Sequence, residues 1–335
     1  MPSLMQAGRL AYALARGRAL PFSMGFILTN RCNFRCVYCD IPEHAGDEMS
    51  VEEFRGAIDE FADCGMARAG FSGGEVSLRP EVVPIVRHAR ERGLFTSMNT
   101  NAWLPEPLAD ELLGLLDMLV ISLDGPEPVH DTVRRRRGSH ARVLELIERA
   151  RGRGVALATI TVLGPWNLEH IDEILALAAE KGFYAYFQPA YESCLDHQTG
   201  LHPVFHPELL DRIATHLTDA RRAGLPLGSS PGYLERLRRG PSFGDCGTCK
   251  AGRYFATVLP DGRVVPCHLT SGQAQYLDGR KVGFRRAFFD MPHPESGPGC
   301  AVTPLQESDL IFGLDGSALA NAARQILAAR FRRTG

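Results

Sequence analysis

The 335-residue sequence lacks any run near the ~20 consecutive apolar residues that a membrane-spanning helix needs. It also lacks an excess of one charge, because 37 Lys and Arg residues stand against 39 Asp and Glu residues. We therefore expect no membrane insertion and no nucleic-acid surface built on bulk charge. The N-terminus has no secretory apolar segment with a cleavage site, so we expect a cytoplasmic protein.

The nine cysteines are not spread along the chain as a disulfide framework would be. Six of them form two tight groups, which are Cys32, Cys36 and Cys39 and then Cys246, Cys249 and Cys267. In a reducing compartment, such groups usually hold metal or carry out redox chemistry. The two groups are therefore the candidate functional centres.

Apolar runs alternate with helical patterns over residues 22–190, which is typical of repeated βα units and a parallel sheet. We expect six strands, near 23–28, 68–72, 95–99, 118–122, 156–162 and 184–188. The helices between them are expected near 50–61, 80–92, 105–115, 140–153 and 168–180. Six βα units can form an α/β partial barrel of the (β/α)6 type, with functional residues at the C-terminal ends of the strands.

Composition and patterning divide the chain into five parts. Residues 191–244 form a bridge with one expected helix near 207–223 between Gly-, Pro- and Ser-rich connections. The cysteine-rich segment after it predicts two strands around the Asp261-Gly262 turn. The parts are an N-terminal helical extension (1–21), the barrel (22–190), the bridge (191–244), a small cysteine-rich α+β domain (245–305) and a C-terminal helix (306–335).

The first cysteine group has the spacing C-x3-C-x2-C and follows the first strand directly. No fourth cysteine lies close by, whereas a structural zinc site needs four protein ligands and a dithiol redox site needs two cysteines. A [4Fe-4S] cluster held by three cysteines leaves one iron open to bind a substrate or cofactor. The spacing, with Tyr38 before the third cysteine, resembles the signature of radical S-adenosylmethionine (SAM) enzymes. A zinc or thiol-redox site is the alternative.

The resemblance implies that SAM binds the open iron and is cleaved to a 5'-deoxyadenosyl radical, which takes a hydrogen atom from the substrate. Tyr38 would pack on the adenine. The third strand ends in Asn-Thr-Asn-Ala, so the sequence departs at Ala102 from the glycine that is common in the family. Other strand ends also match SAM-pocket positions, and they supply Gly73, Gly74, Glu75, Asn99, Ser122, Asp124, Arg134 and Gln188.

The spacing of the second cysteine group, taken alone, favours a zinc site, because a CxxC motif followed by a third cysteine after a hairpin is common in metal-binding knuckles. Beside a barrel of this kind, the segment resembles the opening of the SPASM/twitch auxiliary-cluster domain. Only one cysteine follows Cys267, so the resemblance favours the shortened form with one further [4Fe-4S] cluster, which would relay or accept electrons. Its ligands would be Cys246, Cys249, Cys267 and Cys300.

These motifs predict a radical SAM enzyme that takes its electron from a donor such as flavodoxin or ferredoxin. We expect a small polar substrate, such as a sugar, aminocyclitol or nucleoside, that is dehydrogenated, epimerised or decarboxylated. Cys194, beyond the sixth strand, is a candidate hydrogen-atom donor, and an ordinary loop residue is the alternative. Two other hypotheses remain. One is a maturase of ribosomal peptides or proteins with a separate recognition partner, and the other is a cluster-carrying module without enzymatic activity.

Overall fold

The computed structural model describes residues 3–190, 206–240, 248–270, 272, 275–292 and 300–334, with the backbone alone for 327–334. Its centre is one eight-stranded sheet in the order β6-β5-β4-β3-β2-β1-β7-β8. Every neighbouring pair from β6 to β7 is parallel, and β8 is antiparallel to β7. The strands are β1 (Ser23–Ile27), β2 (Arg68–Ser72), β3 (Phe95–Thr100), β4 (Met118–Ser122), β5 (Ala156–Leu163), β6 (Tyr184–Pro189), β7 (Phe255–Val258) and β8 (Val264–Val265).

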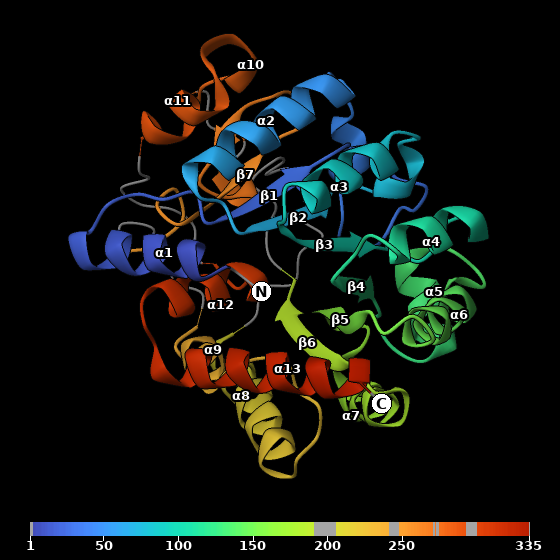
Figure 1. Ribbon diagram of the computed structural model, residues 1–335. Helices are drawn as coiled ribbons and strands as arrows, with labels where there is room; N and C mark the ends of the chain where they lie inside the picture. The colour runs from blue at the N-terminus through green and yellow to red at the C-terminus, as the bar shows by residue number, and fades with distance from the viewer. Residues whose placement is uncertain are drawn as a thin grey trace.

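Helices lie along the outer face of this curved sheet (Figure 1). The six predicted barrel strands and the five helices between them are confirmed, with ends that shift by a few residues. The structure adds a short helix, α5, after β4. The helices of this region are α2 (Val51–Cys64), α3 (Val82–Glu91), α4 (Glu106–Leu113), α5 (Glu127–Arg134), α6 (Ser139–Arg151) and α7 (Ile171–Lys181), and α1 (Leu4–Arg16) precedes them.

The main hydrophobic core lies between the sheet and the helices that cover it. Phe26 of β1 and Phe71 of β2 are fully buried and stack with ring centroids 5.8 Å apart. Phe61 of α2 packs edge-on against Phe26. Residues alternate across a strand, so the neighbouring positions face the inside of the barrel. Gly25 and Gly70, which are partners in the register of β1 and β2, are two of these inward positions.

The segment that follows the bridge does not form a separate sheet. Its predicted hairpin is present, but β7 pairs in parallel with β1 and so continues the barrel sheet. Two short helices follow, α10 (Gly279–Val282) and α11 (Phe284–Phe289), and α11 packs against α2 through Phe284 and Phe288, which contact Phe61. The hairpin strands β7 and β8 therefore extend the barrel sheet, whereas the domain boundary expected at residue 245 lies outside the described residues and stays a prediction.

The bridge contains a helix that the sequence analysis missed. The structure has the expected helix, α8 (Pro207–Arg222), and a second one, α9 (Pro231–Arg238). Ser230 caps the N-terminus of α9, because its hydroxyl accepts a hydrogen bond from the Tyr233 amide. Ser-Pro is a helix start signal, but it stood in a stretch that is rich in glycine and proline. The expectation of a single helix in the bridge is therefore wrong.

The C-terminal helices cover the side of the sheet near β6. The helix α13 (Gly316–Thr334) runs beside β6 and α9, and α12 (Thr303–Phe312) precedes it (Figure 1). The Thr303 hydroxyl donates to the Phe187 carbonyl at 2.9 Å, and the Ala185 carbonyl accepts from the Gly228 amide at 2.8 Å. β6 is an edge strand of the sheet, and these contacts pair and cover its outer edge.

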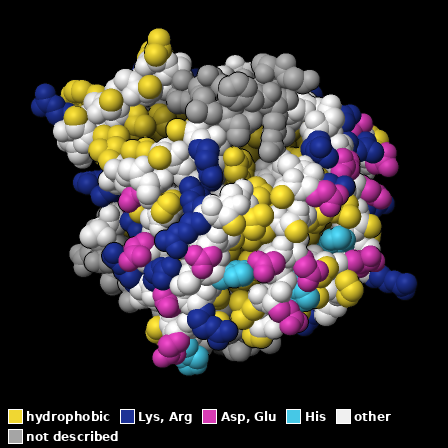
Figure 2. Space-filling view, turned by 90° about the horizontal axis from the view of Figure 1, so that it is seen from below, with side chains coloured by type: hydrophobic (Ala, Val, Ile, Leu, Met, Phe, Trp, Pro, Cys, Tyr) yellow, Lys and Arg dark blue, Asp and Glu magenta, His cyan; other side chains and the backbone are white. Residues whose placement is uncertain are grey.

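The face of the molecule seen in Figure 2 carries basic and acidic side chains intermixed over its described part. This distribution agrees with the near balance of charge in the sequence. Among the described helices, none combines the length and the apolar character that crossing a membrane requires.

Candidate functional site

The first cysteine group lies in the loop after β1, at the C-terminal ends of the strands. Burial raises the pKa of all three thiols, that of Cys39 to about 12, and the nearby Arg134 guanidinium acts in the opposite direction on each. The Phe34 amide donates to the Cys32 sulfur at 3.4 Å, and Arg134 donates to the Cys36 sulfur at 3.7 Å. Such donors stabilise thiolates and the sulfur ligands of an iron–sulfur cluster.

The described residues contain no group of three or more His, Cys, Asp or Glu side chains arranged to hold a single metal ion. The three thiols lie in one partly buried loop near the buried Arg134 guanidinium, and two of them accept hydrogen bonds. This environment fits a cluster that takes its ligands as thiolates. The donor set therefore suits the [4Fe-4S] cluster that the spacing predicts.

The Gly73-Gly74-Glu75 turn after β2 is hydrogen-bonded to the backbone that leads into this loop. The Gly74 amide donates to the Thr29 carbonyl and the Glu75 amide to the Arg31 carbonyl, both at 2.8 Å. A Cβ atom on Gly73 would collide with the Thr29 carbonyl oxygen, and one on Gly74 with the carbonyl oxygens of Asn30 and Arg31. The two glycines therefore permit a close approach to the backbone that leads into Cys32.

The Glu75 side chain is fully buried and joins the tips of β2 and β3. Its carboxylate accepts hydrogen bonds from the Thr100 hydroxyl at 3.0 Å and from the Asn101 amide at 2.7 Å. Asn101 in turn donates to Asn33 at 2.8 Å, inside the cysteine loop. Burial raises the pKa of Glu75, and these donors lower it. The predicted SAM contact of Glu75 stays a prediction.

Ala102 occupies a backbone conformation that favours glycine. Its φ angle is +68°, in the left-handed region. The sequence analysis found alanine here where the resembled family commonly has glycine. The backbone has thus kept the left-handed turn after β3, although the residue has a Cβ atom.

A buried ion pair connects the end of β4 with the cysteine loop. Arg134, on α5, places its Nε 2.6 Å from Asp124 Oδ2, and the same oxygen accepts from the Tyr38 hydroxyl at 3.0 Å. The second carboxylate oxygen accepts from the Val162 amide. Arg134 was predicted to line the SAM pocket, and the structure shows its side chain engaged with Asp124 and Cys36.

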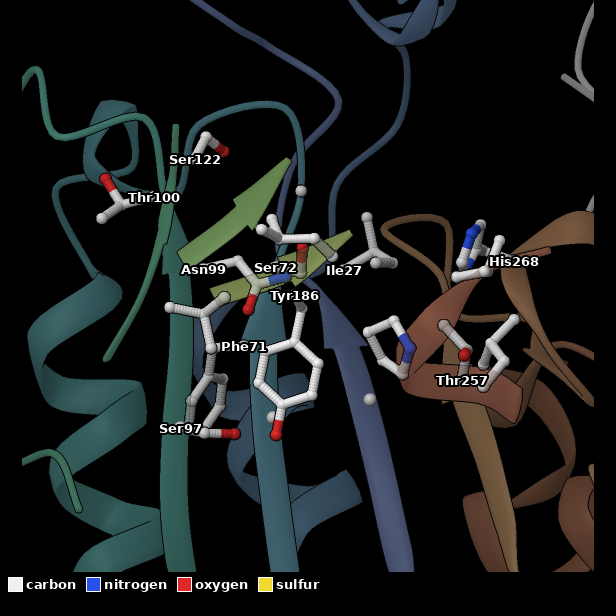
Figure 3. Close-up of a pocket in the computed structure, with 18 of the residues that line it drawn as sticks. Ile27, Phe71, Ser72, Ser97, Asn99, Thr100, Ser122, Tyr186, Thr257 and His268 are labelled. Atoms are coloured by element: carbon white, nitrogen blue, oxygen red, sulfur yellow. The ribbon is translucent and has the colours of Figure 1, made fainter. Parts of the chain in front are cut away.

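The other predicted SAM-pocket residues lie around the same opening. Tyr38 stacks on Trp166, with ring centroids 6.0 Å apart. Figure 3 shows Asn99 and Ser122 at the edge of the pocket, near the strand ends. Gln188 accepts a hydrogen bond from the Thr303 amide at 3.2 Å, at the start of α12.

The second cysteine group is described in part. Cys267 and Cys300 pack together with Leu305 of α12, and Leu305 also packs in the apolar cluster that Cys249 contacts. The hairpin and α12 thus bring three predicted ligands into one region of the molecule. Cys246 and the candidate hydrogen donor Cys194 lie outside the described residues. The auxiliary cluster ligands stay a prediction.

A cavity of about 1640 Å³ extends from the cysteine loop into the barrel. Its mouth is lined by the three cysteines and the strand ends, and its deeper part by residues from the beginning of the strands, among them Arg68 and Tyr184. One wall comes from α12 and α13. This interior was not among the predicted features, although small residues at the inward positions Gly25, Gly70 and Ser97 were a sign of open space.

The comparisons with known proteins agree with this site. The model of the radical SAM superfamily matches residues 26–178. A PqqA peptide cyclase from Rhodopseudomonas palustris is 31% identical over 270 residues, which cover 76% of this chain and 69% of that protein. This chain belongs to the radical SAM superfamily.

The solved structures support the fold. Streptococcus suis SuiB bound to S-adenosylmethionine is similar with a TM-score of 0.69 and 15% identity, over 86% of this chain and 70% of that one. SuiB bound to its precursor peptide SuiA gives a TM-score of 0.66 and 15% identity, over 85% and 70%. The α/β partial barrel is thereby confirmed, and the superfamily uses SAM and a [4Fe-4S] cluster, as predicted.

The expectation of a small polar metabolite as substrate is wrong. The similarity is to peptide cyclases over more than 260 residues, and it favours the peptide maturase that we held as the alternative. The physical reason for the error is that the motifs read from the sequence line the cysteine loop and the strand ends, where cluster and SAM are expected. None of them reports on the residues that line the deeper part of the cavity.

Proposed function

We propose that this protein is a radical SAM enzyme that modifies a ribosomally made peptide, with the recognition of that peptide shared with a separate partner. The observation that carries the proposal is the 31% identity to a PqqA peptide cyclase, which spans 69% of that protein. The cavity supports it as well, because about 1640 Å³ exceeds the roughly 300–1,000 Å³ of most small-molecule pockets. This leaves room for a peptide segment beside SAM.

Cys32, Cys36 and Cys39 would hold the SAM-binding cluster, whose open iron would receive SAM. Bound there, cluster and SAM supply the 5'-deoxyadenosyl radical that abstracts hydrogen. The chain itself fixes the position of this centre, because the Gly73-Gly74-Glu75 turn supports the loop from behind. Arg134, held by Asp124, contributes a cation beside Cys36.

Cys249, Cys267 and Cys300, with Cys246, would hold the auxiliary cluster, which would supply an electron acceptor close to the substrate. An oxidative modification of the peptide removes two hydrogens. One would leave as a hydrogen atom to the deoxyadenosyl radical, and the other would leave as a proton to solvent while its electron reduces the auxiliary cluster. An oxidation, such as formation of a cross-link, is therefore the reaction class that we propose.

The test compares a pool of peptides with a pool of small metabolites. The anaerobically reconstituted enzyme receives SAM, a reductant and one pool, and 5'-deoxyadenosine and peptide masses are measured. We expect the peptide pool to raise 5'-deoxyadenosine and one peptide to lose the mass of two hydrogens. The Cys36→Ala variant, which lacks a cluster ligand, is the matched control. Stimulation by the metabolite pool alone would refute the peptide substrate.

A further inference from the structure

The interior of the barrel below the strand ends carries features that no SAM-binding motif explains. At mid-height the cavity is lined by Gly25 of β1, Gly70 of β2 and Ser97 of β3, which are partners in the register of these strands. Thr257 of β7 lies beside Gly25. These small residues leave the centre of the barrel open, whereas larger inward side chains would fill it.

Arg68, the first residue of β2, reaches into this open space. Its Nη2 donates to the Ser97 hydroxyl at 3.4 Å, and its guanidinium carbon lies 5.4 Å from the centre of the Phe95 ring. The side chain therefore rises past Gly70, which has none. Arg68 is accessible because it borders the cavity.

No carboxylate of the described residues forms an ion pair with Arg68 within 4.0 Å. Two carboxylates that border the same cavity are bound elsewhere. Glu307 accepts from the Ser230 amide at 2.6 Å, and Asp117 accepts from the Thr96 amide at 3.0 Å. Arg68 therefore borders the cavity without a carboxylate partner among the described side chains, and its guanidinium can pair with an anion that enters the cavity.

Tyr186 of β6 completes the polar floor. Figure 3 shows its hydroxyl and that of Ser97 at the same depth, below Ser72 and Asn99. The Tyr186 hydroxyl donates to Gln325 Oε1 of α13 at 2.7 Å, which leaves its oxygen lone pairs directed to other donors. The Tyr186 ring lies directly against Gly228, where a Cβ atom would collide with it.

We propose that this floor binds a carboxylate of the substrate peptide, with Arg68 as the counter-ion. The inference rests on the proposed function and names the kind of residue that the site accepts, an acidic side chain that enters from the mouth. Ser72 and Arg68 are four residues apart along β2, so the floor lies roughly 13 Å below the strand ends at about 3.3 Å per residue. An arginine and a glutamate side chain, extended toward each other, span most of this depth. The planar guanidinium suits two parallel hydrogen bonds to a carboxylate.

The experiment measures binding of four probes to the holoenzyme with SAM by calorimetry. Two are pentapeptides with blocked ends, with Glu or Gln in the centre of four alanines. The third is an all-alanine peptide with a free C-terminal carboxylate, and the fourth is glutarate. We expect the Glu peptide to bind the wild type at least about tenfold more tightly than the Gln peptide.

The variants assign this preference to Arg68. Arg68→Gln should bring the ratio of the two affinities to about one, and Arg68→Lys should keep part of the preference. Arg222→Gln, which changes an exposed arginine of α8, is the matched control and should leave the ratio unchanged. Arg68→Met removes the charge in a second way, should Arg68→Gln fail to fold.

Equal binding of the Glu and Gln peptides to the wild type would overturn the inference, as would a preference that survives in both charge-removing variants. Tighter binding of the free-acid peptide would assign the floor to a C-terminus and overturn the acidic side chain. Peptides that raise 5'-deoxyadenosine without any advantage for Glu would leave the proposed function standing and refute the subsite. If glutarate bound in an Arg68-dependent way and no peptide bound, the peptide substrate would be refuted. Arg68 would then be the carboxylate-binding residue for a small molecule.

Discussion

Replacement of Gly74 by alanine should displace the cysteine loop. A Cβ atom there would lie 2.7 Å from the Asn30 carbonyl oxygen and still closer to that of Arg31, whereas real Cβ atoms essentially never approach within 3.0 Å. Backbone must therefore move and weaken two hydrogen bonds of 2.8 Å, from Gly74 to Thr29 and from Glu75 to Arg31. Overpacking costs about 1–3 kcal/mol and each hydrogen bond about 0.5–1.5 kcal/mol, so we expect a loss of about 2–6 kcal/mol.

Two measurements check this expectation, the free energy of unfolding by denaturant and the visible absorbance of the reconstituted cluster. Gly74→Ala should lower both, and it should lose most 5'-deoxyadenosine formation. Gly56→Ala is the matched control, because Gly56 lies inside α2 with open space around it. That change should stabilise the protein by up to about 1 kcal/mol. If Gly74→Ala matched the control in stability and cluster content, the role of the turn as a support of the loop would be refuted.

Three further predictions concern the buried groups. Arg134→Gln leaves its carboxylate partner buried and unpaired and should cost about 3–5 kcal/mol in denaturant unfolding, whereas Arg142→Gln, at an exposed pair, should cost under about 1 kcal/mol. Burial, with Arg134 and His140 adding to it, lowers the pKa of His130 from 6.5 to about 3. The unfolded chain therefore binds the proton first, and stability should fall as pH drops below about 6.5, by up to about 1.4 kcal/mol per pH unit. His130→Asn should flatten that slope in unfolding curves between pH 7.5 and 5.5, and an unchanged slope would contradict the assignment. Cys267→Ala should lower the iron bound per chain to about half, whereas Cys64→Ala should leave it unchanged, and full iron in the first variant would refute the auxiliary site.

The centre at the strand ends could be predicted from the sequence, because its parts are local. The spacing of Cys32, Cys36 and Cys39 and the Gly73-Gly74-Glu75 turn each stand within a few residues after a strand. Parallel strands bring such turns to one edge of the sheet. The six barrel strands were also predictable, because each is marked locally by an apolar run that alternates with a helical pattern.

What the sequence did not show depends on contacts between distant segments. The pairing of β7 with β1 joins residues more than 200 positions apart, and no local pattern indicates it. The position of Arg134 on Asp124 and Cys36 depends on how α5 packs, although the residue itself was singled out. Arg68 was read only as the start of a strand, since its role as a cation in the cavity requires Gly70 and Ser97 beside it.

We propose that the deoxyadenosyl radical takes its hydrogen atom from a peptide. The most direct test supplies the holoenzyme, SAM and reductant with a responding peptide in which the carbon-bound hydrogens of one residue type at a time are replaced by deuterium. We expect deuterium to appear in 5'-deoxyadenosine for one residue type, together with a peptide product that lacks two hydrogens. Formation of 5'-deoxyadenosine with no deuterium from any labelled peptide, while a labelled small metabolite transfers its deuterium, would contradict the account.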